Sequence, residues 1–244
     1  MKAIISKKGH GLRHMILAHG FLGLPSEWDF LIENLKDKYT FHLLTLPGHQ
    51  EAPIDSNIEE FFESLAEYAT AFKSFSLLGY SMGGRLLLEF ALRNLSSIEA
   101  LILESANPGI RDQNEREARY NKDLLGFQER SFADFLNDWY LQCLFNPKLN
   151  YHVSEKLMEH ELHRLERAMA VFSPGLRPSL WNELKHLKNI SCHFISGAQD
   201  HKYFNIGNEL KSIGWKHHTL DSYHNVHLER PIEYLELIKK LEQS

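Results

Sequence analysis

Short apolar runs alternate along this chain with longer stretches in which apolar residues recur at helical spacing. The runs predict strands at 15–18, 41–44, 75–79, 100–103, 193–196 and 217–220. The periodic stretches predict helices at 26–35, 58–72, 82–95 and 232–241. Because such alternation is typical of a mostly parallel sheet flanked by helices, we expect an α/β fold.

The alternation is interrupted between about Pro108 and Trp181. This segment is rich in Arg, Glu, His, Leu and Trp, contains no clear strand-like run, and fits several helices. We therefore predict a core formed by residues 1–107 and 182–244, with a helical lid inserted at 108–181. Parallel sheets bind ligands at the carboxyl ends of their strands, so an insertion there is expected to select the substrate.

One serine stands between two glycines directly after a predicted strand, in the segment Gly79-Tyr80-Ser81-Met82-Gly83. This pattern is that of a nucleophile elbow, a turn from strand to helix that presents a strained serine above the sheet edge. Glycines are needed two positions on either side because strand and helix leave no room there for side chains. An amphipathic stretch follows, so the surrounding sequence favours a nucleophile elbow at Ser81.

A serine hydroxyl is a weak nucleophile or base unless a histidine takes its proton and a carboxylate orients that histidine. Asp200 comes after the predicted strand 193–196, and His224 comes after the last predicted strand and before the final helix. The order Ser81, Asp200, His224 is the one expected after a G-x-S-x-G elbow. These three residues are the predicted catalytic triad.

Two other residues compete for the same roles. Glu104 ends an earlier predicted strand, from which a carboxylate also reaches such a histidine, and His227 lies three positions after His224. Two histidines this close can suggest metal ligation, but the pattern H-E-x-x-H is absent and no third ligand is evident nearby. We expect neither a metal nor a cofactor.

Two backbone N–H groups are needed to form an oxyanion hole, which stabilises negative charge on a carbonyl oxygen. Met82, the residue after the serine, supplies one of them. The turn His19-Gly20-Phe21 follows the predicted strand 15–18, and its glycine lets the loop bring the Phe21 amide toward the site. Phe21 and Met82 are therefore the predicted donors.

Composition narrows the class of protein. With 244 residues, of which 43% are hydrophobic and 24% charged, the chain has enough apolar material for one substantial core. The formal net charge is −5 and no Lys/Arg cluster exceeds a pair, which argues against nucleic acid as a partner. No apolar run approaches the span of a bilayer and no secretion signal is evident, so we expect a cytoplasmic protein without a membrane partner. Cys143 and Cys192 lie far apart and predict no disulfide.

These features together resemble the α/β-hydrolase superfamily over essentially the whole chain. Within it, the chain resembles more closely the family of 2-succinyl-6-hydroxy-2,4-cyclohexadiene-1-carboxylate synthase, a pyruvate-eliminating lyase of menaquinone biosynthesis. The motifs that carry this resemblance are the elbow extended to Arg85, Glu117-Ala118-Arg119 and Asp138-Trp139-Tyr140 in the lid, and the segments around Asp200 and His224.

The resemblance implies a small substrate with several carboxylates, and arginine binds carboxylates in a bidentate manner. Arg85 lies one helical turn after Ser81 and is expected to face the same pocket, while Arg119 would reach in from the lid. Trp139 and Tyr80 would shape the cavity. The resemblance also implies that Ser81, relayed through His224, removes a proton from the cyclohexene ring as pyruvate leaves.

One feature of the family is missing from this chain. A further lid arginine is usual near the position of Leu157, and Lys156, His160 and Arg164 are the nearby candidates to replace it. One contact to a substrate carboxylate is therefore unassigned.

A serine hydrolase acting on a small ester or thioester would use the same triad and is the alternative function. If Arg85 and Arg119 converge on Ser81, an anionic substrate is favoured; if they point to solvent, a neutral ester is favoured. A binding module without activity would be expected to lack a triad member, and none is missing. The sequence is compatible with a monomer or a small homo-oligomer.

Overall fold

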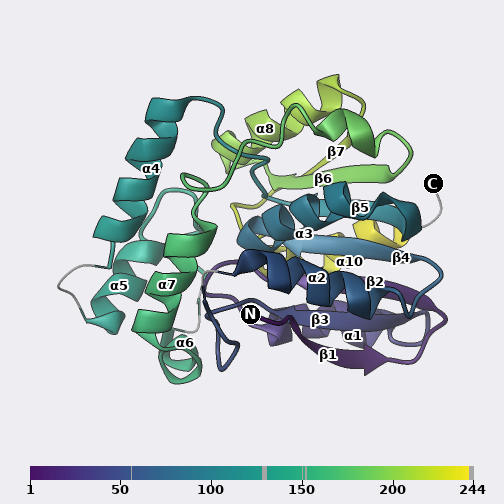
Figure 1. Ribbon diagram of the computed structural model, residues 1–244, viewed down its shortest axis with the longest axis horizontal. Coiled ribbons are helices and arrows are strands. Elements are labelled where there is room, and N and C mark those ends of the chain that lie inside the picture. Colours follow the sequence, from purple (N-terminus) through teal and green to yellow (C-terminus); the bar gives the residue numbers. More distant parts are fainter. Residues whose placement is uncertain (56, 128–130, 150, 152, 242–244) are drawn as a thin grey trace.

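The computed structural model describes residues 1–55, 57–127, 131–149, 151 and 153–241. In this part of the chain, seven strands form one sheet in the order β1-β3-β2-β4-β5-β6-β7 (Figure 1). All neighbours run parallel except β1 and β3, which are antiparallel. The strands are β1 (Ile4–Gly9), β2 (Arg13–Ala18), β3 (Tyr39–Thr45), β4 (Phe75–Tyr80), β5 (Ile98–Glu104), β6 (Ser191–Gly197) and β7 (Lys216–Leu220).

The six predicted strands are confirmed as β2 to β7, whereas β1 was not predicted. This strand lies at the edge of the sheet and is largely exposed, with lysines at two of its six positions. Exposed edge strands commonly carry charged residues, which discourage pairing with other chains. A strand of this kind therefore lacks the apolar run by which its buried neighbours are recognised.

Successive residues of the strands point to opposite faces of the sheet, and each face is covered by helices. On one face, Ile16 of β2 packs with α2 (Ile58–Ala69), α3 (Ser81–Arg93) and α8 (His201–Ser212). On the other, Leu17 packs with α1 (Asp29–Leu35) and α10 (Pro231–Leu241). The four predicted helices are confirmed as α1, α2, α3 and α10, the first preceded by the 3-10 turn η1 (Pro25–Trp28).

The chain between β5 and β6 forms helices in its described part, as the sequence predicts. They are α4 (Gln113–Leu125), α5 (Phe132–Tyr140), α6 (Val153–Glu159) and α7 (Leu162–Phe172). Figure 1 shows them grouped beside the edge at which the parallel strands end. The assignment of 108–181 as a lid, with core boundaries at 107 and 182, stays a prediction.

This helical segment is attached to the core through one loop in particular. Phe21 and Leu22, which follow β2, form an apolar cluster with residues of the segment, namely Phe127, Phe135, Leu136, Leu165 and Met169. Burial of each large apolar side chain contributes about 1.5–3 kcal/mol, so the cluster holds the helices against this loop. The loop is the one from which the sequence predicts an oxyanion-hole donor.

The remaining described elements are short. The 3-10 turns η2 (Leu95–Ser97) and η3 (Leu184–Leu187) precede β5 and β6, and α9 (Val226–Glu229) follows β7. Among the helices of the described residues, none is both long enough and apolar enough to cross a membrane. Cys143 and Cys192 both carry free thiols.

Candidate active site

Ser81 occupies a sharp turn between the end of β4 and the start of α3. Its φ is 49°, in the left-handed region that a residue with a side chain rarely adopts. A Cβ atom added to Gly83 would lie 2.2 Å from the carbonyl oxygen of His19, and one added to Gly79 would lie 2.6 Å from the Cα atom of Gly84. The glycines are therefore required by backbone contacts, and the turn has the geometry of a nucleophile elbow.

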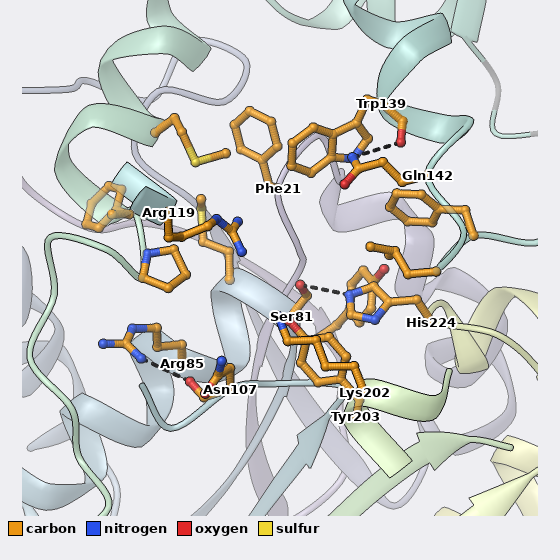
Figure 2. A pocket seen from close by; sticks show the side chains of 17 residues that line it. Phe21, Ser81, Arg85, Asn107, Arg119, Trp139, Gln142, Lys202, Tyr203 and His224 are labelled. Carbon is orange, nitrogen blue, oxygen red and sulfur yellow. Dashed lines mark hydrogen bonds between the residues drawn. The ribbon is translucent and has the colours of Figure 1, made fainter. Parts of the chain in front are cut away.

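His224 lies between Ser81 and Asp200 and is hydrogen-bonded to both side chains. Its Nδ1 is 2.6 Å from Asp200 Oδ2. Its Nε2 is 3.1 Å from Ser81 Oγ, as the dashed line in Figure 2 marks. Since a carboxylate only accepts, Nδ1 carries the hydrogen and Nε2 accepts from the serine hydroxyl. Asp200 is 2% exposed, and its other oxygen accepts the Tyr203 N–H at 3.3 Å. The three side chains thus have the hydrogen-bond order of a Ser-His-Asp triad.

Glu104 and His227, the two residues that competed for the roles of acid and base, bond to each other instead. Glu104, which is completely buried at the end of β5, accepts the backbone N–H of His227 at 3.1 Å and lies 2.9 Å from its Nδ1. The imidazole of His227 stacks on Trp28, with ring centroids 4.2 Å apart. Tyr80 separates the two acid–histidine pairs, because its ring lies 5.3 Å from that of His224 and 5.2 Å from that of His227.

The loop after β2 passes beside Ser81. A Cβ atom on Gly20 would lie 3.4 Å from the Cβ atom of Ser81 and 2.6 Å from the ring of Tyr80, so this glycine permits the close approach. The loop turns at once, because the Gly23 N–H donates to the Gly20 carbonyl at 3.0 Å and Leu22 has a φ of 62°. Phe21 and Met82, the two predicted oxyanion-hole residues, both line the same cavity as Ser81.

Residues of the helical segment line this cavity across from Ser81 and His224 (Figure 2). Its apolar wall includes the side chains of Phe21, Trp139, Phe145, Met169 and Phe172. Tyr80, Arg85, Arg119 and Trp139, the residues predicted to bind substrate, all lie among its lining residues. Sequence reasoning did not assign pocket roles to Asn107, Gln142, Leu144, Lys202 or Tyr203, which also line it.

Arg119 and Lys202 place positive charge in the cavity. The guanidinium of Arg119 is directed into it (Figure 2), and its Nε donates to Asp123 Oδ1 at 2.7 Å. Lys202 enters from the core side, two residues after Asp200. Burial, together with the charge of Arg119, lowers the pKa of Lys202. The positive charges of Arg119 and Lys202 therefore repel each other, and an anion bound between them would stabilise both charged forms.

Arg85 contributes to the cavity in another way. Its side chain is buried and its guanidinium turns away from Ser81 (Figure 2), where Nη1 donates to Asn107 O at 3.0 Å and Nη2 to Pro178 O at 2.7 Å. Burial lowers the pKa of Arg85 to about 10. Of the two arginines expected to face Ser81, only Arg119 directs its guanidinium into the cavity. The guanidinium of Arg85 instead joins two loops of the cavity wall.

The three candidates to replace the missing arginine are all bonded elsewhere. Lys156 donates to Leu22 O and to Glu27, His160 Nδ1 accepts the Gln50 N–H at 3.1 Å, and Arg164 Nη2 donates to Ala52 O at 2.6 Å. None of them is among the described residues that line the cavity. The signal that could have identified Lys202 in their place is its position two residues after the predicted acid.

In the stretches of chain that the structure describes, no group of three or more His, Cys, Asp or Glu side chains is placed to hold a metal ion.

Comparison with known proteins agrees with this fold. Residues 13–185 match the model of the alpha/beta hydrolase fold family, so the chain belongs to that family. Within it, the chain belongs with proteins named 2-succinyl-6-hydroxy-2,4-cyclohexadiene-1-carboxylate synthase. A Haemophilus influenzae protein that bears a provisional form of this name is 30% identical over 205 residues, which are 78% of this chain and 82% of that protein.

Two further comparisons extend over nearly the whole chain. The synthase of that name from Enterobacter sp. strain 638 is 27% identical, over 91% of this chain and 88% of the relative. The solved structure of MenH from S. aureus superposes with a TM-score of 0.90 at 24% identity, covering 98% of this chain and 97% of that one. This structural likeness shows the same fold from end to end.

Proposed function

We propose that this protein is a lyase that eliminates pyruvate from a carboxylated cyclohexene intermediate of menaquinone biosynthesis. The observation that carries the proposal is a cavity in which a Ser81–His224–Asp200 hydrogen-bond chain faces the cations Arg119 and Lys202. The triad alone would serve a hydrolase equally well, but a neutral ester has no use for two positive charges on the wall of the cavity. The named relatives support the same reaction.

In the proposed reaction, Ser81 acts as a base rather than as a carrier of an acyl group. Its Oγ takes a proton from a ring carbon while its own proton passes to His224 Nε2, and Asp200 stabilises the resulting imidazolium. The electron pair of the broken C–H bond forms a ring double bond as the bond to the leaving oxygen breaks. The leaving group departs as the enolate of pyruvate, which takes up a proton at carbon to become pyruvate, and the His224 imidazolium gives up its extra proton, which restores the triad.

Negative charge develops on a carbonyl oxygen of the substrate during this step. The amides of Phe21 and Met82 are the proposed donors to that oxygen, one from the loop after β2 and one from the start of α3. Arg119 and Lys202 bind the carboxylates, and Tyr80 and Trp139 confine the ring. Arg85 acts by holding the cavity wall. A cytoplasmic location and a monomeric or small homo-oligomeric state stay predictions.

The experiment supplies the purified protein with the enzymatically generated menaquinone precursor and follows pyruvate release, with a p-nitrophenyl ester as a second substrate. We expect pyruvate release by the wild type and none by Ser81→Ala. Arg119→Ala should raise the KM for the precursor by on the order of 10- to 100-fold while ester hydrolysis stays unchanged, because a charged hydrogen bond contributes about 1.5–3 kcal/mol.

Arg167→Ala is the matched control, since Arg167 lies on the same helical segment but is exposed. It should behave as the wild type does with both substrates. Rapid ester turnover without pyruvate formation would overturn the proposal and establish the alternative, a serine hydrolase.

A further inference from the structure

Lys156 is a buried lysine on α6, far in sequence from the loop that it contacts. Its side chain is 5% exposed, and its Nζ donates to the carbonyl oxygen of Leu22 at 2.5 Å and to Glu27 Oε1 at 3.0 Å. Glu27 is itself only 12% exposed. A lysine loses much hydration energy on burial, so a buried ammonium at this place depends on these two acceptors.

Leu22 is the strained residue of the loop beside Ser81. The turn from Gly20 to Gly23 has its positive φ at the third position, as a type II turn does, and that position usually carries glycine. Here it carries leucine at a φ of 62°. A residue is held in such a conformation only when its surroundings fix it from several directions.

Both polar backbone groups of Leu22 have partners outside the turn. Its N–H donates to His49 Nε2 at 3.1 Å, and its carbonyl oxygen accepts from Lys156. His49 Nδ1 lies 3.2 Å from the Pro47 carbonyl, to which it donates, so Nε2 is the acceptor. Burial holds the pKa of His49 well below its ordinary value, which keeps the ring neutral and this acceptor available.

The residue before Leu22 is Phe21, whose amide is a proposed oxyanion-hole donor. The direction of that amide is set by the turn, and the turn is held on one side by the core through His49 and on the other by α6 through Lys156. A catalytic donor displaced by 1 Å can cost about 100-fold in rate, so the support of this turn matters to the reaction.

We propose that Lys156 is a positioning residue that, paired with Glu27, holds the Leu22 carbonyl and thereby aims the Phe21 amide at the reacting carbonyl oxygen. The inference rests on the oxyanion hole of the proposed function. It gives Lys156 a different role from the missing family arginine: it acts through the loop and does not touch the substrate. The helical segment therefore contributes to the chemistry as well as to substrate selection.

The test compares Lys156→Met, Glu27→Gln and the double variant in the full-length protein. Pyruvate release and p-nitrophenyl ester hydrolysis are measured, together with the rate at which a fluorophosphonate ester labels Ser81. We expect kcat to fall on the order of 10- to 100-fold with both substrates, KM to change by less than about 3-fold, and labelling to slow by the same factor. Because the two side chains act as a unit, the double variant should lose no more than Lys156→Met alone.

Lys148→Met is the matched control, since Lys148 is exposed in the same helical segment, and it should leave all rates unchanged. Melting curves confirm that each variant is folded at the assay temperature, and Glu27→Gln carries the test if Lys156→Met does not fold. A rise in KM for the carboxylated substrate alone, with ester kcat unchanged, would show that Lys156 contacts substrate and would overturn the inference. Losses that multiply in the double variant would overturn it too.

The ester and labelling measurements do not depend on pyruvate elimination. If the wild type released no pyruvate but hydrolysed the ester, the proposed function would fail while the role of Lys156 would still be decided by the other two rates.

Discussion

Asp200→Asn and Glu104→Gln are matched perturbations, because each replaces a buried carboxylate that bonds a histidine Nδ1 by an amide of the same shape. Asp200 lies 2.6 Å from His224 Nδ1, and Glu104 lies 2.9 Å from His227 Nδ1. Both carboxylates are at most 2% exposed. The two variants therefore remove the same chemical feature from two neighbouring sites, one of which bonds Ser81.

Asparagine at position 200 favours the wrong tautomer of His224. Its amide can donate to Nδ1, and the ring hydrogen then moves to Nε2, which faces Ser81 Oγ at 3.1 Å as a second donor. Ser81 can no longer pass its proton to the histidine. The expected loss in kcat is about 10⁴-fold, which corresponds to about 5.5 kcal/mol of transition-state stabilisation.

Glutamine at position 104 mainly affects stability. Glu104 accepts from both the backbone N–H and the Nδ1 of His227, and an amide has one oxygen to serve them. Loss of about one charge-assisted hydrogen bond corresponds to about 2 kcal/mol, or a melting temperature lower by about 4–8 °C for a chain of this size. Activity should stay within about 10-fold, since Glu104 reaches Ser81 only through His227 and Tyr80.

The assay measures ester hydrolysis, pyruvate release and fluorophosphonate labelling for both variants, and thermal unfolding in parallel. Asp200→Asn should be folded and nearly inactive, whereas Glu104→Gln should be less stable and active. The reverse pattern, with Glu104→Gln inactive and Asp200→Asn active, would refute the assignment of the acid from hydrogen-bond geometry.

Three further predictions concern Arg85, Gly83 and His19. Arg85→Met leaves the carbonyls of Asn107 and Pro178 without their donor, so stability measured by urea titration should fall by about 1–3 kcal/mol, with a smaller rise in KM than Arg119→Ala causes. Gly83→Ala places a Cβ atom 2.2 Å from a backbone oxygen and should cost about 3 kcal/mol or more; a normal melting temperature would contradict this. Burial lowers the pKa of His19 to about 3, whereas the unfolded chain takes up this proton below about pH 6.5. The free energy of unfolding should therefore fall by about 1.4 kcal/mol per pH unit as pH falls from about 6.5 toward 3. Unfolding midpoints at pH 7, 6, 5 and 4 should decline less steeply in His19→Gln.

Much of the fold was predictable because its signals are local. Buried parallel strands such as β4 are continuous apolar runs, and helices such as α2 repeat with a period set by their own geometry. The strand β1 was missed for the same reason, since an exposed edge strand has no such run. The elbow was also local, because strand, serine and glycines occupy adjacent positions.

The order of residues along the chain favoured Asp200 as the partner of His224 but left Glu104 and His227 as alternatives, because each pair joins residues from different elements. Asp200 and His224 are 24 positions apart, and Glu104 and His227 are 123 apart. Glu104 ends β5 and Asp200 follows the end of β6 by three residues, so both acids lie at the same sheet edge and a carboxylate from either position can reach a histidine there. Which carboxylate meets which histidine depends on how the loop after β7 crosses that edge.

The alternation of elements, the place of the elbow and the residue types that the chemistry needs all depend on neighbouring positions, so they follow from the order of residues. Which charges face Ser81 depends instead on how distant segments pack together. Arg85 and Lys156, both expected to be able to meet substrate, donate to backbone carbonyls, whereas Lys202 lines the cavity. The physical reason is that a buried cation takes the nearest acceptors available to it, and those acceptors are brought together only when the helical segment packs on the core.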